Sequence, residues 1–161
     1  MSPHGEQLIR RTWALIEERR ETFESSFLDC LGTLAPDLSA MMREAAAHLE
    51  RGSLVAILGE LVECAAEPRA LLLAAAAMGE RLGELGIARP DYEIVGSALI
   101  RTLEQELGAR LSPEAKRAWR ELLGVAAGAM QRASGWRGNQ NRVRIVGQVS
   151  FRPSTGRRNH D

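Results

Sequence analysis

The segment "MGERLGELGIARPDY", residues 78–92, joins the end of one helix to the start of another. Gly86 is a favourable left-handed stop at the C-terminal end of a helix. Pro90 opens the next helix, because proline is tolerated in a first turn. The segment is therefore expected to contain a helix end, a stop and a fresh helix start, with Leu82 in the last turn of the first helix.

Helical periodicity continues on both sides of this segment and dominates up to about residue 133. Serine followed by proline starts a helix at Ser2 and again at Ser112, and Pro36 ends one because the preceding residue avoids helical angles. The spacing predicts helical stretches over residues 2–34, 45–66, 69–85, 90–107 and 112–133, with a turn-like "PDLSAMM" at 36–42. We therefore expect one all-α domain of six or seven helices over residues 1–133, without strands.

Composition places the chain among ordinary single-domain globular proteins of the cytoplasm. It has 161 residues, 45% hydrophobic and 26% charged, and only 4% aromatic, so the core must be aliphatic. No apolar run reaches the ~18 residues that span a bilayer, and the N-terminus lacks an apolar signal core. Cys30 and Cys64 stand alone and are expected to be free thiols in a reducing compartment.

A net charge of zero hides an asymmetry between the body and the C-terminal segment. Residues 134–161 carry six Arg and one Asp, whereas residues 1–133 carry 15 basic and 20 acidic side chains. Gly, Asn and Ser are frequent in this tail, and Val143, Ile145, Val149 and Phe151 allow a short strand beside a disordered end. A basic tail can contact a protein partner or an anionic surface.

Enzyme motifs are missing from the sequence. It contains no Gly-rich dinucleotide or phosphate loop, no G-x-S-x-G and no H-E-x-x-H. His4, His48 and His160 are the only histidines, and a zinc site would need Cys30, Cys64 and His48 to converge without clustered spacing. An enzymatic role is therefore disfavoured.

Two stretches nevertheless resemble a known family. "FLDCLGTLAPDLSAMM" resembles the region from the second helix to the following corner in bacterial haemoglobins and in the haem domain of flavohaemoglobins. "GIARPDYEIVGSALIRTLEQELGARLSPEAKRAWRELLGVAAGAM" resembles their last two helices, most specifically in "RPDY-x-x-VG-x-AL-x-x-TL". The resemblance covers about residues 6–133 and implies a globin fold of six to eight helices with an irregular basic tail.

On the proximal side, the resemblance implies that the residue bound to haem iron should stand at position 82. Leu82 occupies it, and an isobutyl group has no lone pair for a metal. Tyr92 stands where the family has a tyrosine that holds the proximal histidine, and the acid of that relay falls near Ser134. The relay has therefore kept its tyrosine and lost its histidine and its acid.

On the distal side, the family's haem-stacking phenylalanine matches Met42 and its tyrosine matches Leu28. Its glutamine matches Glu50 within one residue, and its apolar residue matches Leu54. Glu50 also suits a helix first turn as an ordinary surface acid, since negative charge is favourable there. Substitute metal ligands would be Met78, one turn before Leu82, Met42 or His48.

These departures favour a globin-like protein with a degenerate haem site, acting as a haem-free sensor, regulatory or interaction module. The cavity that holds haem in that family would then be filled by Leu28, Met42 and Leu82, or would accept an apolar small ligand. The alternative is a haem-binding globin for oxygen or nitric oxide with unusual axial ligation. A third reading is an enzyme that uses Tyr92 or Glu50 for proton transfer. Globins in general suggest a homodimer through the last two helices.

Overall fold

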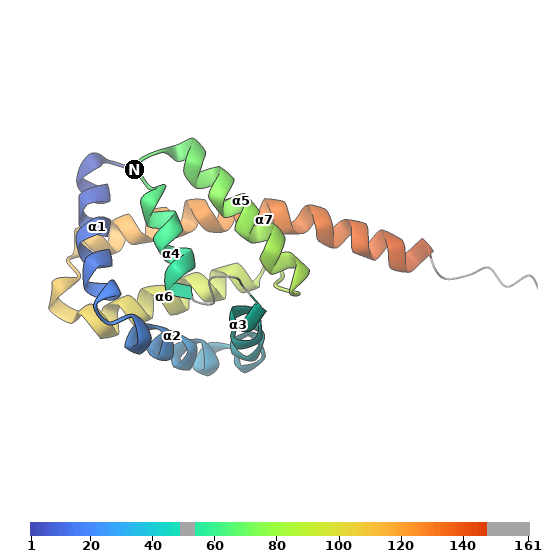
Figure 1. Ribbon diagram of the computed structural model, residues 1–161, viewed down its shortest axis with the longest axis horizontal. Helices are drawn as coiled ribbons and strands as arrows, with labels where there is room; N and C mark the ends of the chain where they lie inside the picture. Colours follow the sequence, from blue (N-terminus) through green and yellow to red (C-terminus); the bar gives the residue numbers. More distant parts are fainter. Residues whose placement is uncertain (49–53, 148–161) are drawn as a thin grey trace, which may run out of the picture.

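Seven α-helices form the described part of the molecule, and no strand occurs there (Figure 1). The computed structural model describes residues 1–48 and 54–147, with side chains described up to residue 134 except at 45, 46 and 48. The helices are α1 (Pro3–Glu17), α2 (Arg20–Leu34), α3 (Pro36–His48), α4 (Leu54–Glu63), α5 (Pro68–Glu84), α6 (Asp91–Leu107) and α7 (Pro113–Gly147). A 3₁₀ turn, Gly108–Arg110, joins the last two. The all-α prediction is confirmed.

The helix ends follow the sequence signals. Ser2 Oγ accepts a hydrogen bond from the Gly5 amide at 3.1 Å, and Ser112 Oγ accepts one from the Ala115 amide at 3.1 Å. Gly86 has φ 94° and ends α5, with the Ile87 amide donating to the Leu82 carbonyl at 3.0 Å. A positive φ costs glycine little, so the chain can reverse at this position.

The region around residues 36–54 differs from the sequence expectation. Residues 36–42, expected to be turn-like, belong to α3, which continues to His48. The helix expected over 45–66 is therefore divided between α3 and α4, and residues 49–53 lie outside the described part. Pro36 ends α2 as expected but also stands at the first position of α3, where its missing amide leaves no bond unmade.

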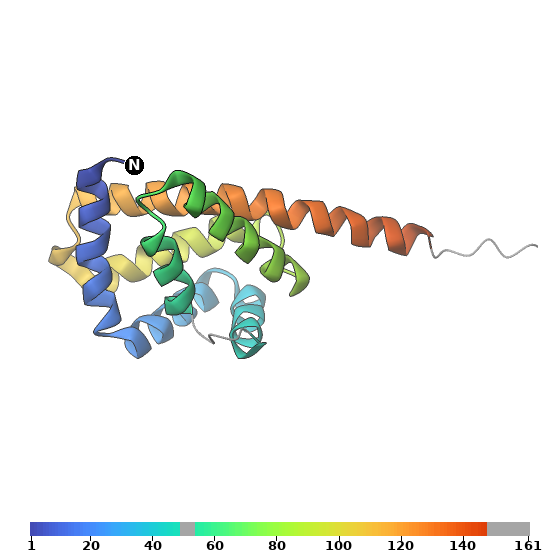
Figure 2. The ribbon, with the colours of Figure 1, turned by 45° about the horizontal axis from the view of Figure 1, so that its top comes forward.

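Helix α7 is longer than the periodicity suggested. It continues from Pro113 to Gly147 and runs past the body of the molecule, as Figures 1 and 2 show. The strand expected at Val143 and Ile145 is therefore wrong, because both residues lie in this helix. Val149 and Phe151 fall outside the described residues. The boundary placed between residues 133 and 134 lies inside one continuous helix.

A pair of tryptophans fastens the first helix to the last. Trp13 of α1 and Trp119 of α7 have ring centroids 6.5 Å apart, at 49° to each other. Trp119 Nε1 donates to Thr12 Oγ1 at 2.7 Å, so the buried indole keeps a partner. The rest of the core is mainly aliphatic, as the composition predicted, with Phe23, Phe27 and Tyr92 as its other aromatic members. No helix in residues 1–48 or 54–147 is long and apolar enough to cross a membrane.

Candidate functional site

An apolar chamber lies between helices α4, α6 and α7, and residues of α3 and of the end of α5 complete its lining. Its free volume is about 60 Å³. The fifteen lining residues are apolar apart from the hydroxyl of one tyrosine: Met42, Leu54, Ile57, Leu58, Leu61, Leu82, Ile87, Tyr92, Val95, Gly96, Leu99, Leu123, Ala126, Ala127 and Met130. This chamber is the candidate site, because four of the seven residues proposed from the sequence line it.

The end of α5 closes the chamber because α5 and α7 approach each other very closely. A Cβ atom on Gly79 would lie 2.5 Å from the carbonyl oxygen of Met130, and one on Gly83 would lie 3.2 Å from Ser134 Cβ. Only glycine allows this separation at position 79, since the obstacle there is backbone. Leu82 lies between the two glycines, is 8% exposed and lines the chamber.

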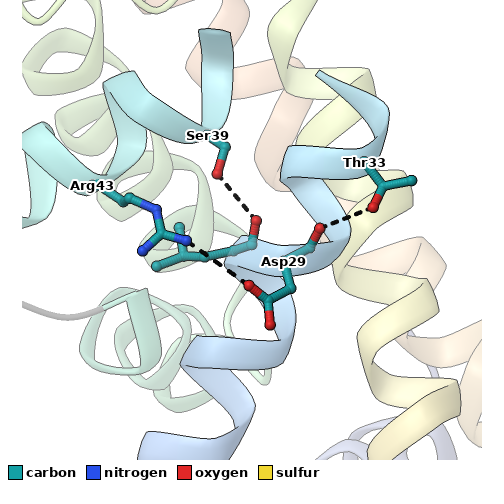
Figure 3. A network of polar contacts seen from close by, with 5 residues as sticks. Asp29, Thr33, Ser39 and Arg43 are labelled. Atoms are coloured by element: carbon teal, nitrogen blue, oxygen red, sulfur yellow. Dashed lines mark hydrogen bonds and ion pairs between the residues drawn. The ribbon is translucent and has the colours of Figure 1, made fainter. Parts of the chain in front are cut away.

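Met42 enters the chamber from α3, which is held against α2 by polar contacts at the corner between them (Figure 3). Ser39 Oγ donates to the Leu28 carbonyl oxygen at 3.0 Å, which ties the first turn of α3 to α2. Arg43 and Asp29 approach to 3.9 Å, but both are exposed, and such surface pairs contribute little. The hydrogen bond from Ser39 to Leu28 therefore helps to hold α3, which carries Met42, against α2.

Tyr92 carries a buried hydroxyl without a hydrogen-bond partner among the described residues. Its side chain is 4% exposed. Burial raises the pKa of this hydroxyl above its ordinary value of 10.0; nearby Ser134 lowers it and Asp91 raises it. Ser134 Oγ donates to the Gln131 carbonyl at 3.2 Å, and no atom of the described residues meets hydrogen-bond geometry with Tyr92 Oη. Burial therefore decides the direction, and an unmade bond of this kind costs about 1–3 kcal/mol.

The structure brings together some of the residues proposed from the sequence and separates others. Met42, Leu54, Leu82 and Tyr92 line the chamber. Met78 is buried on α5 but does not line it. Leu28 is half-buried on α2, packs against the core and also stays outside the lining. Glu50 lies outside the described residues, and the side chain of His48 does too.

Sequence reasoning missed most of the chamber wall and the glycine contact that closes it. Ile57, Leu58 and Leu61 of α4 have helical spacing, which predicts a buried face but does not show that this face lines a chamber. Gly79 and Gly83 did carry a usable signal, because two glycines four residues apart within a helix cost about 1 kcal/mol each relative to alanine. Such a cost indicates that a neighbouring backbone needs the space.

The lining residues do not fit the haem that the resemblance implies. A volume of about 60 Å³ is far below the ~300–1,000 Å³ of pockets that bury drug-sized ligands. None of the lining residues carries an imidazole, and the hydroxyl of Tyr92, which in the resemblance would hold a proximal histidine, has no described partner. The thioethers of Met42 and Met130 are the lining atoms nearest in chemistry to an iron ligand.

Comparison with known proteins supports the fold assignment. No curated protein matches this chain. The family model described as Globin matches residues 23–130, which run from α2 to the middle of α7 and include every described residue of the chamber wall. The match covers more than half of the chain, and the chain therefore belongs to the globin family.

Proposed function

We propose that this protein is a globin with a degenerate haem site, working without haem as a sensor, regulatory or interaction module. The observation that carries the proposal is Leu82, whose side chain lines a small apolar chamber at the position where the resemblance to bacterial haemoglobins places the iron ligand. A leucine there offers no lone pair, so no protein–iron bond forms at this position.

Free-energy magnitudes support this proposal. Burying several hundred Å² of an apolar macrocycle contributes on the order of 10 kcal/mol at ~25 cal/mol/Å². Association and ordering cost a similar amount, roughly 4–15 kcal/mol. Side chains already occupy most of the space between α4, α6 and α7, so admitting haem would also separate packed residues. Without an axial bond the balance is unfavourable.

The test is expression of the full chain with haem supplied, followed by desalting and an absorption spectrum. We expect no Soret band, together with strong helical circular dichroism. A strong Soret band near one haem per chain would overturn the proposal in favour of a haem globin with unusual ligation for oxygen or nitric oxide. Met42→Leu, Met78→Leu and His48→Ala would then identify the ligand, since the band shifts only when the ligating side chain is removed.

An interaction module needs a partner surface, and the groove between α6 and α7 is the best candidate. It has a volume of about 610 Å³ and includes Gly96 and Gly124. A Cβ atom on either glycine would meet nothing within 4 Å, so no packing among the described residues requires glycine there. The rim carries Glu93, Arg101 and Arg120, which form no ion pair among the described residues.

Charge positions along α6 favour a second copy of the chain as the occupant of this groove. Glu93 and Arg101 lie four residues on either side of Ser97, about 6 Å each at 1.5 Å per residue. A two-fold axis that crosses the helices at Ser97 would lay α6 antiparallel on its copy and place Glu93 opposite Arg101 twice. The same axis meets α7 at Leu123, because α6 and α7 are antiparallel and Glu104 pairs with Lys116.

Cysteine cross-linking tests this homodimer. In a background with Cys30→Ala and Cys64→Ala, Ser97→Cys should oxidise to a disulfide-linked dimer, because facing α-carbons at the axis come within the 4.4–6.8 Å that a disulfide spans. Gln105→Cys is the matched control, since it is exposed on the same helix but lies about 12 Å from the axis. Equal cross-linking of both variants, or none with Ser97→Cys, would contradict this register.

We also propose that the basic tail, residues 134–161, contacts a partner of opposite charge. The tail's six arginines follow an acidic body, and the first three fall within α7 where that helix runs past α5 (Figure 2). A protein partner or an anionic surface fits this charge. Binding that is unchanged after removal of residues 137–161 would dismiss it.

A further inference from the structure

The apolar chamber and the groove between α6 and α7 share part of one wall. Gly96 of α6 and two residues of α7, Leu123 and Ala127, line both spaces. All three are half-buried, whereas chamber residues such as Leu61 and Leu99 are buried. The chamber therefore adjoins the groove at these three residues, and solvent reaches them from the groove.

Side chains cover this shared wall poorly. Gly96 has no side chain, and a Cβ atom placed on it would meet nothing within 4 Å. Ala127 contributes only a methyl group, so Leu123 is the one residue of the three with a longer side chain. The wall between the chamber and the groove is consequently thinnest at Gly96.

Gly124 of α7 provides an internal comparison for Gly96. The ion pair between Glu104 and Lys116 sets the register of the two antiparallel helices. Eight residues along each helix from this pair lead to Gly96 and to Gly124, so the two glycines stand at the same level. A Cβ atom on either would meet nothing within 4 Å, but Gly124 lines the groove and not the chamber. A side chain added at either position would narrow the groove, and only one at Gly96 would also narrow the opening of the chamber.

The lining of the chamber selects the class of molecule that can use such an opening. It carries no charged group, so an ion would lose its hydration without meeting an opposite charge. A water molecule needs two to four polar partners to be held in a cavity, and this lining is apolar apart from one buried hydroxyl. A neutral apolar molecule loses little on leaving water and fits this lining.

We propose that a neutral apolar molecule enters the chamber from the groove between α6 and α7, through the thin part of the shared wall at Gly96. A second copy of the chain that covers the groove then closes this entrance. Assembly would thereby set how fast the chamber exchanges its ligand. This inference rests on the proposed function, because it needs a chamber without haem and a partner on the groove.

Xenon is the probe for this entrance, because it is neutral and apolar and enters dry protein cavities. The protein is the full chain, with its methionines labelled with ¹³C at the ε methyl group. Met42 and Met130 line the chamber and report its occupancy, and the exposed Met1 serves as the reference. Saturation transfer in ¹²⁹Xe NMR measures the exchange rate, at a protein concentration where sedimentation shows a monomer.

We expect Gly96→Leu to slow xenon exchange at least about ten-fold relative to the natural chain, which corresponds to ~1.4 kcal/mol of added barrier. Gly124→Leu is the matched control and should leave the rate nearly unchanged. Equal slowing by both variants, unchanged exchange in Gly96→Leu, or no saturable binding by the natural chain would overturn the inference. Slower exchange in Leu54→Trp but not in Gly96→Leu would place the entrance at the start of α4 and would contradict it as well.

Smaller substitutions decide the question if Gly96→Leu does not fold. Gly96→Ala and Gly124→Ala each add one methyl group that meets nothing within 4 Å. Slower exchange in Gly96→Ala alone would support the entrance at Gly96. Equal exchange rates in the two alanine variants would refute it.

The role of the second copy is measured on the natural chain at higher concentration. Xenon exchange should slow where sedimentation shows a dimer, and an unchanged rate in the dimer would overturn the closing of the entrance. A chain that stays monomeric at every concentration would remove the proposed homodimer, while the comparison of Gly96→Leu with Gly124→Leu would still decide the entrance. A Soret band in the same sample would remove the haem-free function and this inference together.

Discussion

Helix α7 packs against α1, α5 and α6, and glycine serves a different purpose at the contacts with α5 and α6. On α5, Gly79 and Gly83 face α7 so closely that a Cβ atom at position 79 would collide with the backbone of Met130. On the other side, Gly96 of α6 and Gly124 of α7 border an open groove in which a Cβ atom would meet nothing. The first contact is complete within the chain, whereas the second leaves its space unfilled.

This difference separates a helix contact that is filled by the chain itself from a groove that a partner can enter. The contact between α5 and α7 places Leu82 in the wall of a chamber with a free volume of about 60 Å³. The groove between α6 and α7 keeps two helix-weakening glycines that no contact among the described residues requires. Glycines that contact nothing in the described part of the chain support the proposal that a second copy of the chain covers the groove.

The largest expected effect comes from breaking the closed contact. Gly79→Ala should lower the free energy of unfolding by about 2–3 kcal/mol, because the added methyl meets a backbone carbonyl that cannot rotate away. Thermal unfolding should shift downward by roughly 5–10 °C for a domain of this size. Calorimetry or circular dichroism measures the shift. Gly128→Ala is the matched control on α7, since its methyl would meet only the end of Arg132 at 3.7 Å; equal loss in both variants would contradict the close approach.

A substitution in the groove between α6 and α7 should raise the free energy of unfolding instead of lowering it. Gly124→Ala should stabilise the monomer by about 0.5–1 kcal/mol, because alanine costs less backbone entropy in a helix and nothing lies in its way. Urea denaturation at low protein concentration measures this gain. If a second copy covers the groove, the same methyl should weaken the dimer in sedimentation at high concentration. A less stable monomer would show that the groove is closed within the chain.

The smallest expected effect on stability concerns Tyr92, whose buried hydroxyl lies near Ser134 of α7. Its pKa is raised by burial, so the folded state keeps the phenolic proton at a pH where the unfolded chain loses it. Stability from this group is present below pH 10 and declines as pH rises through 10 towards the folded pKa, with a slope of at most about 1.4 kcal/mol per pH unit. Denaturation of the natural chain and of Tyr92→Phe between pH 9 and 11 measures it, and parallel curves would contradict the burial.

Sequence reasoning reached the fold and part of the site. The caps at Ser2 and Ser112 and the stop at Gly86 are local signals, and they predicted helix ends that the structure confirms. The helix α3 was not predicted as such, because Pro36 can both end one helix and begin the next. The sequence alone does not show that it does both. Leu28 was placed at the pocket by its match to a family pattern and Met78 by its position one turn before Leu82, yet neither lines the chamber.

By itself the sequence determined the all-α class, the helix ends near its prolines, serines and glycines, and the leucine at position 82. These features depend on backbone preferences and on residue identity, which act over a few neighbours. Only the tertiary structure decided that Gly79 lies against the backbone of Met130, that the chamber is small and apolar, and that the Tyr92 hydroxyl has no described partner. Those features depend on distances between helices far apart in the chain, which are fixed only when the side chains of all the helices pack at once.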